Sequence, residues 1–228
     1  MSLSVELVRG NLARAAARID AARIRGGWDH PVRLVVATKY VDLQDMAALR
    51  DVGVRLVGEN RSDELERKWR CYGDAFEYHF IGHLQHRKVR QVLPCVTMIH
   101  SVESLRLVRE LDARADGVVD VLLEVNVSGE ESKNGILPDS AEAFLVEAAP
   151  YSAVRFVGFM TMAPLVSDPE VVRPVFAGLR KLRDRLAPVF ASRFPLSELS
   201  MGMSNDFEVA VEEGATMVRL GSTLFSRA

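Results

Sequence analysis

Short runs of apolar and β-branched residues alternate with longer helical patterns along the chain, and this alternation is the strongest constraint on the fold. We expect strands in eight such runs: 33–38, 54–57, 78–81, 96–99, 118–127, 154–160, 199–201 and 216–220. Apolar residues recur at helical spacing in the stretches 43–51, 61–69, 101–115, 139–149, 169–191 and 205–213. Strands that alternate with helices pair in parallel through crossover connections.

Eight strand–helix units in 228 residues predict a single domain, residues 1–228, folded as a (β/α)8 TIM barrel. Barrels of this type typically need ~250 residues. An amphipathic pattern over residues 3–25 adds one helix before the first strand, and no Pro/Gly/Ser-rich linker divides the chain. An open, doubly wound sheet is the alternative that the same alternation allows.

The composition narrows the classes of partner and compartment. The net charge is −2, which indicates neither a nucleic-acid-binding nor a membrane-surface protein. No apolar stretch approaches the ~20 residues that span a bilayer, and the first residues show no signal-peptide pattern. The two cysteines, Cys71 and Cys95, suggest no disulfide framework. We therefore expect a cytoplasmic protein.

Lys39 directly follows the first predicted strand. Desolvating a lysine at the mouth of a sheet is costly, so the residue needs a reason to be there. A lysine amine can form a Schiff base with a carbonyl compound or with pyridoxal 5'-phosphate (PLP). The alternative is a lysine that has simply left the strand into solvent.

Two loops near the end of the chain could bind a phosphate group. The stretch 202–206 leads into a helix, where Ser204 or Asn205 is placed to be the N-cap. After the last strand, Gly221 permits close approach to a ligand, and two hydroxyl residues follow it. The loops after strands seven and eight form the usual phosphate site of such barrels. Ordinary helix capping is the competing interpretation.

Arg219 lies inside the apolar strand 216–220. If its side chain points into the barrel it needs an acceptor, because the guanidinium stays charged. A pyridine nitrogen is one such acceptor. An internal ion pair or a surface position would also explain this arginine.

Other signals are discounted. His79, His83 and His86 have no accompanying Cys, Asp or Glu cluster, so we expect no metal site. His100 and Ser101 are expected just after the fourth strand, and the basic run 86–90 is expected to be a solvated helix face. The chain has no Walker-type, dinucleotide-binding or Gly-x-Ser-x-Gly motif.

Several ordered stretches resemble one protein family. They are Ala37-Thr38-Lys39, Val57-Gly58-Glu59-Asn60-Arg61, His79-Phe80-Ile81-Gly82-His83-Leu84-Gln85, Glu124-Val125-Asn126, Ser132-Lys133-Asn134-Gly135, Gly158-Phe159-Met160-Thr161-Met162, Leu199-Ser200-Met201-Gly202-Met203-Ser204-Asn205-Asp206 and Met217-Val218-Arg219-Leu220-Gly221-Ser222. Together they resemble the YggS/PROSC family of PLP-binding proteins. The pattern departs from the family at Asp42, where a proline is common, and at Arg87, where an asparagine is common.

The resemblance implies a barrel similar to the N-terminal domain of alanine racemase. It also implies that Lys39 holds PLP as an internal aldimine and that Asn60 lies near the cofactor. Ser204, Gly221 and Ser222 would contact the phosphate, and Arg219 would face the pyridine nitrogen. Family members act in PLP homeostasis without established catalytic turnover, with PLP-dependent apo-enzymes as possible recipients. The resemblance leaves a monomer or a weak dimer open.

Two other functions remain open at this point. A PLP-dependent amino-acid racemase or lyase would need a second acid–base group near Lys39; His83, Tyr40 and Cys71 are the conceivable ones. The resemblance implies that related racemases take a catalytic tyrosine from a second domain, and in 228 residues we expect no such domain. A barrel that binds another phosphorylated metabolite without a cofactor would share the phosphate loops.

Overall fold

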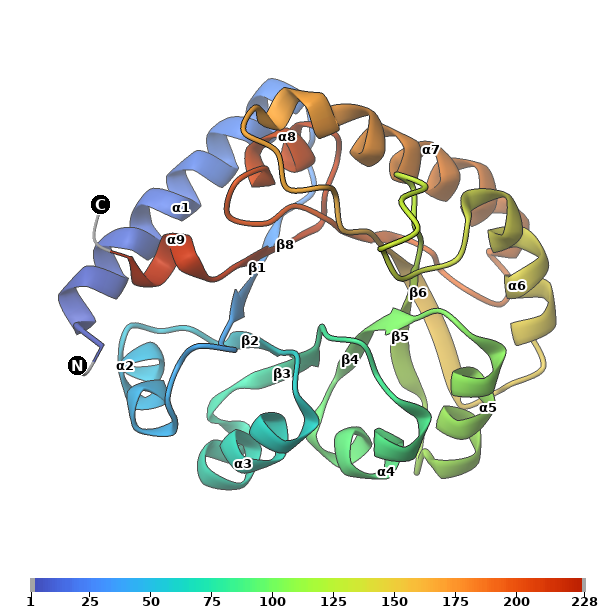
Figure 1. The fold of residues 1–228 in the computed structure, drawn as a ribbon, viewed down its shortest axis with the longest axis horizontal. Helices are drawn as coiled ribbons and strands as arrows, with labels where there is room; N and C mark the ends of the chain where they lie inside the picture. The colour runs from blue at the N-terminus through green and yellow to red at the C-terminus, as the bar shows by residue number, and fades with distance from the viewer. Residues whose placement is uncertain (1–2, 227–228) are drawn as a thin grey trace.

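Eight parallel strands close into a barrel in chain order, and helices surround it (Figure 1). The structure is a computed structural model that describes residues 3–226. It confirms the predicted barrel and excludes the open sheet. The expected domain, 1–228, extends beyond the described residues at 1–2 and 227–228.

The strands agree closely with the predicted runs. They are β1 (Arg33–Ala37), β2 (Leu56–Glu59), β3 (Glu77–Phe80), β4 (Met98–Val102), β5 (Val119–Glu124), β6 (Val154–Met160), β7 (Glu198–Ser200) and β8 (Met217–Leu220). The barrel closes where β8 pairs with β1, with Val36 opposite Leu220.

The α-helices fill most of the connections. They are α1 (Val5–Gly26), α2 (Met46–Asp51), α3 (Ser62–Tyr72), α4 (Val89–Val92), α5 (Leu105–Arg114), α6 (Ala141–Ala148), α7 (Arg173–Phe190), α8 (Phe207–Glu212) and α9 (Ser222–Phe225). The basic run 86–90 was expected on a helix face; it forms a short 3-10 turn, His86–Lys88, and the start of α4. No helix within residues 3–226 has the length and apolar character to cross a membrane.

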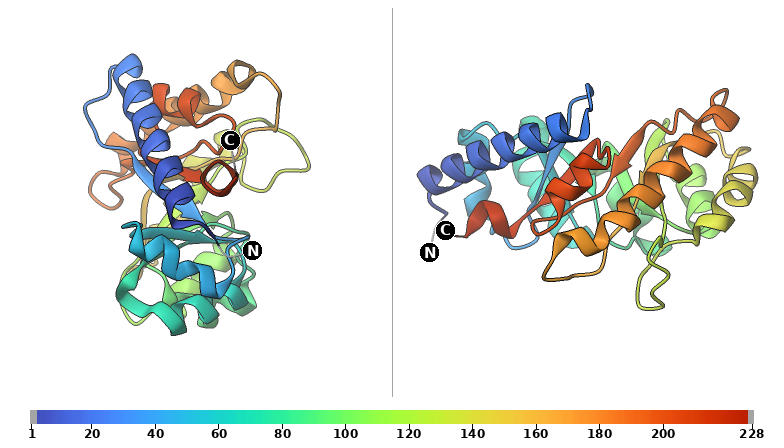
Figure 2. Two further views of the ribbon diagram at one scale, coloured as in Figure 1. Left: turned by 90° about the vertical axis from the view of Figure 1, so that its left-hand side faces the viewer. Right: turned by 90° about the horizontal axis from the view of Figure 1, so that it is seen from above.

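Helix α1 is the predicted extra helix, and its sequence sets both of its ends. The Ser4 side chain accepts a hydrogen bond from the Leu7 amide, and Gly27 ends the helix with a φ of 73°. The helix packs along α8 and α9, on the side where the barrel closes (Figure 2). Asn11 fixes this packing because its amide donates to the Leu224 carbonyl at 2.9 Å.

Two apolar regions stabilise the barrel. A large one joins the outer faces of the strands to the helices. A smaller one fills the barrel interior with Val35, Leu56, Met98, Leu122, Val157, Met160 and Met217. The interior is therefore a packed core, as in other barrels of this type.

The fourth strand begins and ends later than the sequence predicts. It was expected over 96–99 and runs from Met98 to Val102, so His100 and Ser101 lie within the strand. Both are fully buried and hydrogen-bonded: His100 to Ser200, and Ser101 to the Gly82 carbonyl. The prediction was wrong because it treated polar residues as the end of a strand, whereas these have partners inside the fold. Helix α5 accordingly begins at Leu105, with Ser104 as its N-cap.

Candidate functional site

The carboxyl ends of the strands meet at one rim of the barrel, where the segment that follows β8 lies against the end of β1. A Cβ placed on Gly221 would lie 3.4 Å from the Ala37 carbonyl oxygen, two residues before Lys39. β8 also pairs with β7, which leads into the loop carrying Ser204. One side of the rim therefore gathers five of the predicted residues, Lys39, Ser204, Arg219, Gly221 and Ser222.

The loops after β7 and β8 are joined through Ser204. Its hydroxyl oxygen accepts long hydrogen bonds from the backbone amides of Gly221, at 3.5 Å, and Thr223, at 3.4 Å. The predicted capping role of Ser204 or Asn205 was wrong, because Asp206 occupies the N-cap position of α8. The Asp206 carboxylate instead accepts from the Met203 amide at 2.6 Å, which closes the turn ahead of the helix. Thr223, the second of the two hydroxyl residues that follow Gly221, also belongs to this cluster.

Gly221 differs from the other glycine of these loops. Gly202 needs to be glycine, because its φ is +92° and a Cβ there would lie 2.6 Å from the Ala210 side chain. Gly221 has a φ of −130°, and apart from its chain neighbours no described atom would approach its Cβ closer than 3.4 Å. Contacts within the protein therefore do not require glycine at 221. A ligand that approaches the backbone closely would.

Arg219 points into the barrel, as one of the alternatives anticipated. Its side chain is 5% exposed and donates three hydrogen bonds, to the Ser200 carbonyl, the Ser200 hydroxyl and the Thr161 carbonyl. Burial lowers the pKa of Arg219 to about 10, and nearby Glu124 and Asp206 oppose this shift. The guanidinium therefore stays charged at neutral pH. It has five N–H donors, and two of them have no acceptor among the described residues.

Lys39 lies in the turn after β1, and its side chain is exposed. Its ammonium nitrogen lies 4.9 Å from the centroid of the Tyr40 ring, a cation–π distance. Both residues border an open depression between the segment after β1 and the start of α3, where Arg61 and Arg67 also lie. Within residues 3–226 the structure shows no hydrogen bond from Lys39 to the Ser204–Gly221 cluster. Lys39 therefore lies at the same rim as that cluster and is not hydrogen-bonded to it.

A buried ion pair supports the backbone that carries Lys39. The Lys68 ammonium group of α3 donates to the Glu59 carboxylate at 2.7 Å and to the Thr38 carbonyl at 2.8 Å. The Thr38 hydroxyl donates to the same Glu59 oxygen at 2.8 Å. Lys68 is 1% exposed and Glu59 is fully buried. These contacts fix the peptide immediately before Lys39.

Asn60 stands at the rim after β2, next to this ion pair. Its backbone amide donates to Glu59 at 3.2 Å, and its own side chain is exposed. Gly82 packs against it so closely that a Cβ on Gly82 would lie 2.4 Å from the Asn60 carbonyl oxygen. The Asn60 position is therefore set by both the β2 and β3 loops.

Glu124, at the end of β5, places an unusual carboxyl group in the same interior. It is 2% exposed, and burial together with nearby Glu103 raises its pKa to about 7, against the opposing effect of Arg219. Its ordinary pKa is 4.5. Glu124 is therefore the carboxyl group near Arg219 whose charge changes close to neutral pH.

Glu124 is expected to make the stability of the ligand-free protein depend on pH. Below pH 4.5 the carboxyl is neutral in both the folded and unfolded chain and has no effect. Above pH 4.5 this carboxyl ionises in the unfolded chain but stays neutral in the folded protein. The free energy of unfolding therefore falls between pH 4.5 and about pH 7, by about 3 kcal/mol in total.

Glu124→Gln should therefore increase the free energy of unfolding at pH 8 and leave it nearly unchanged at pH 4. Urea unfolding at both pH values measures this. The exposed Glu131→Gln is the control, and an equal gain for both variants at pH 8 would contradict the assignment.

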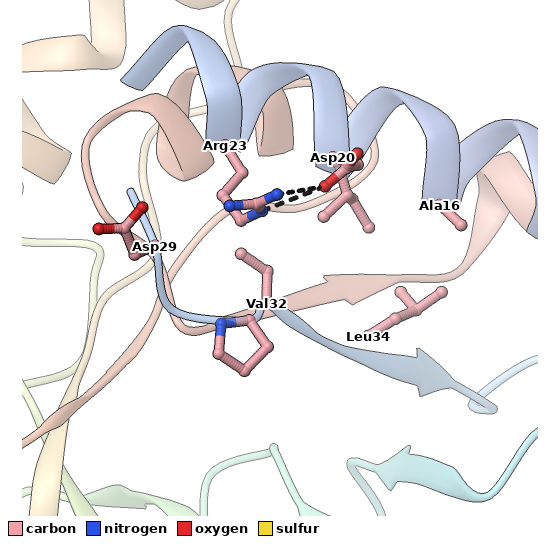
Figure 3. Close-up of a pocket in the computed structure, with 8 residues that line it drawn as sticks. Ala16, Asp20, Arg23, Asp29, Val32 and Leu34 are labelled. Atoms are coloured by element: carbon pink, nitrogen blue, oxygen red, sulfur yellow. Dashed lines mark hydrogen bonds and ion pairs between the residues drawn. The ribbon is translucent and has the colours of Figure 1, made fainter. Parts of the chain in front are cut away.

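A second depression lies away from the rim. It is lined by Ala16, Ile19, Asp20, Arg23, Asp29, Pro31, Val32 and Leu34, between α1 and the start of β1 (Figure 3). Arg23 already donates to Asp20 within it, at 2.7 Å. It lies at the end of β1 opposite Lys39 and holds none of the predicted site residues. Within residues 3–226, no group of three or more His, Cys, Asp or Glu side chains is arranged to hold a metal ion.

Known proteins are similar to this chain in fold and sequence. The family described as "Alanine racemase, N-terminal domain" matches residues 11–227. A pyridoxal phosphate homeostasis protein of Aquifex aeolicus is 41% identical over 219 residues, covering 94% of this chain and 95% of that protein. PipY of Synechococcus elongatus is 31% identical, over 92% of this chain and 99% of PipY. Its structures without and with PLP give TM-scores of 0.81 and 0.79.

An alanine racemase of Clostridium difficile shares the barrel alone. It is 13% identical with a TM-score of 0.76, over 100% of this chain and 58% of the racemase. Both the family match and the relatives extend over nearly the whole chain. The chain therefore belongs to the alanine racemase N-terminal domain family and, within it, to the pyridoxal phosphate homeostasis proteins.

Proposed function

We propose that this protein binds PLP at the rim, attaches it to Lys39 and contributes to PLP homeostasis without catalytic turnover. The observation that carries the proposal is Arg219, a buried cation at the end of β8 with two N–H donors that no described residue accepts. The ring nitrogen of PLP would accept from one of these two donors. The name of the Aquifex aeolicus relative and the PLP-bound structure of PipY support the same ligand.

The other residues fit the remaining parts of the cofactor. The amides of Gly221 and Thr223 make only long hydrogen bonds to Ser204, so a phosphate oxygen offers them a stronger acceptor. We assign Ser204, Gly221 and Ser222 to the phosphate, and Asn60 to the border of the site. Lys39 attaches the cofactor after its flexible side chain leaves the Tyr40 ring. PLP, when bound, supplies a reactive aldehyde and an electron-withdrawing ring.

The group proposed to lie opposite the ring nitrogen supports the proposed absence of turnover. An arginine that donates to this nitrogen leaves it unprotonated, which makes the ring a weaker electron sink than one paired with a carboxylate. The pKa of Glu124 lies near 7, but the structure shows no hydrogen bond from this carboxyl to Lys39 among the described residues. The geometry therefore favours holding PLP over transforming amino acids.

The exposed rim suits transfer of the cofactor to another protein. We propose PLP-dependent apo-enzymes as recipients and the cytoplasm as the location. Cys71 and Cys95 are both free thiols in the structure, as a reducing compartment allows.

Spectral titration tests the proposed function. Adding PLP to the purified protein should produce a saturating visible absorbance band with one cofactor bound per chain. A protein that stays colourless and retains no PLP in equilibrium dialysis would contradict the proposal.

Incubating the loaded protein with single amino acids and following chiral inversion or product formation tests the absence of turnover. Turnover that Lys39→Ala abolishes would overturn that part.

Gly221→Ala should separate ligand binding from stability. The ligand-free protein has room for the new methyl group, so the free energy of unfolding should change by less than about 1 kcal/mol. Binding of PLP should weaken by at least tenfold, because the methyl group stands where the phosphate approaches the backbone. Gly202→Ala is the control that should cost about 1–3 kcal/mol of stability through strain. Unchanged PLP affinity in Gly221→Ala would contradict the phosphate assignment.

A further inference from the structure

A chain of buried hydrogen bonds crosses the barrel interior and ends on Arg219. Arg219 on β8 donates to the Ser200 hydroxyl of β7 at 2.5 Å, and this hydroxyl lies 2.9 Å from His100 Nδ1 on β4. His100 Nε2 lies 2.9 Å from His79 Nδ1 on β3, and His79 Nε2 lies 3.0 Å from the Glu77 carboxylate. β4 and β7 are not neighbours in the barrel, so the contact between them passes through its interior.

The protonation states of the groups in this hydrogen-bond chain determine which atom carries each proton. Hydrogen bonding to His79 and to Arg33 holds the pKa of Glu77 at about 2, so Glu77 is an ionised acceptor at neutral pH. His79 Nε2 must therefore carry a proton. Burial lowers the pKa of His79, so its ring is neutral and its Nδ1 is an acceptor.

The same reasoning continues along the chain. His79 Nδ1 can only accept, so His100 Nε2 must donate to it. Burial holds the pKa of His100 well below its usual value, so this ring is also neutral and its Nδ1 accepts the Ser200 proton. Ser200 then presents only lone pairs to Arg219. Every donor in the chain points from the Arg219 cation toward the Glu77 anion.

We propose that His79, His100 and Ser200 are positioning residues for Arg219, and that they hold its guanidinium toward the cofactor through this oriented relay. Hydrogen bonds that point the same way polarise one another, so the Ser200 oxygen becomes a stronger acceptor than an isolated hydroxyl. The relay thus lets the Glu77–Arg33 pair, at the amino end of the barrel, stabilise a buried cation near the opposite rim. The proposal rests on the proposed function for the role of Arg219, but the relay itself exists without the cofactor.

The orientation matters because Arg219 forms no ion pair with a carboxylate in the described part of the chain. All three of its hydrogen bonds go to uncharged oxygen atoms. A buried charge that is not directly paired with a carboxylate depends strongly on the quality of such acceptors. Removing the Ser200 hydroxyl leaves Arg219 with two carbonyl partners and more freedom to turn.

Nitrogen-15 NMR of the histidine rings tests the relay in the ligand-free protein. His79 and His100 should both be neutral at pH 8, each with its proton on Nε2. A neutral ring with its proton on Nδ1, or a doubly protonated ring at that pH, would overturn the relay. This measurement involves no cofactor, so it stands whether or not the protein binds PLP.

The positioning role is tested by PLP binding in folded variants. Ser200→Ala and His100→Leu should weaken PLP affinity about ten- to hundredfold and shift the visible band of the bound cofactor. Ser200→Thr, which keeps the hydroxyl, should restore both. Met98→Leu changes an apolar interior residue of the same strand as His100 and should change neither the PLP affinity nor the visible band.

If the wild type binds no PLP, the proposed function fails. If the wild type binds and Ser200→Ala matches it in affinity and spectrum, the positioning role fails.

Discussion

Lys39→Ala is expected to abolish the covalent attachment of PLP and the visible absorbance band that accompanies it. Only an amine can form this bond, and the exposed Lys39 follows β1 at the rim that the phosphate loops share. The phosphate and ring-nitrogen contacts should survive, so residual PLP should bind reversibly, with affinity reduced at least a hundredfold. Absorbance spectra and equilibrium dialysis measure the two effects separately.

A matched lysine variant makes this result specific. Lys181 lies exposed on α7, outside the rim cluster, and Lys181→Ala should keep the full absorbance band. An unchanged band in Lys39→Ala would show that another amine carries the cofactor.

Lys68→Met is expected to be the most destabilising single change considered, at about 3–5 kcal/mol. The variant leaves the Glu59 carboxylate buried without its cation, at a position with no solvent exposure. It also frees the Thr38 carbonyl, which now holds the peptide before Lys39. Urea unfolding of the ligand-free protein gives the loss directly.

The double variant Glu59→Gln with Lys68→Met should recover a large part of this loss, because it removes both charges together. Arg155→Met, which breaks an exposed ion pair with Asp120, should cost less than about 1 kcal/mol. A loss below 1 kcal/mol in Lys68→Met would contradict the view that this pair supports the rim.

The barrel could be predicted because strand and helix patterns repeat regularly along the sequence. Short apolar runs alternate with amphipathic stretches, which predicts a parallel sheet, and the eight strand–helix units favour a closed barrel over an open sheet. The loops after β7 and β8 could be located for the same reason. The carboxyl ends of all strands in such a barrel lie at one rim, so the residues that follow each predicted strand lie there too. Arg219 could be singled out because a charge inside the apolar run 216–220 has no local explanation.

The supporting contacts could not be predicted, because they join residues far apart in sequence. Ser200 and His100 are separated by 100 positions and meet only when the barrel closes. Lys68 had one usable signal: it shares a helix face with buried Leu65, three residues earlier, where a charge needs a partner. Glu59 showed no such signal, because an acidic residue at a strand end looks solvated until the fold is known.

The position of the Lys39 side chain also depends on tertiary structure. The sequence predicts that Lys39 follows β1, but it does not predict the side-chain rotamer that brings Lys39 to the Tyr40 ring. Local packing in the ligand-free protein determines this rotamer. It leaves the ammonium group accessible to an incoming aldehyde.

Borohydride reduction of the PLP-loaded protein, followed by peptide mass spectrometry, tests the central claim most directly. The chain has five lysines, Lys39, Lys68, Lys88, Lys133 and Lys181, so the attachment point can be assigned without ambiguity. The account predicts one reduced pyridoxyl phosphate group per chain, on the peptide that contains Lys39. A label on another lysine, or no label after loading with PLP, would contradict it.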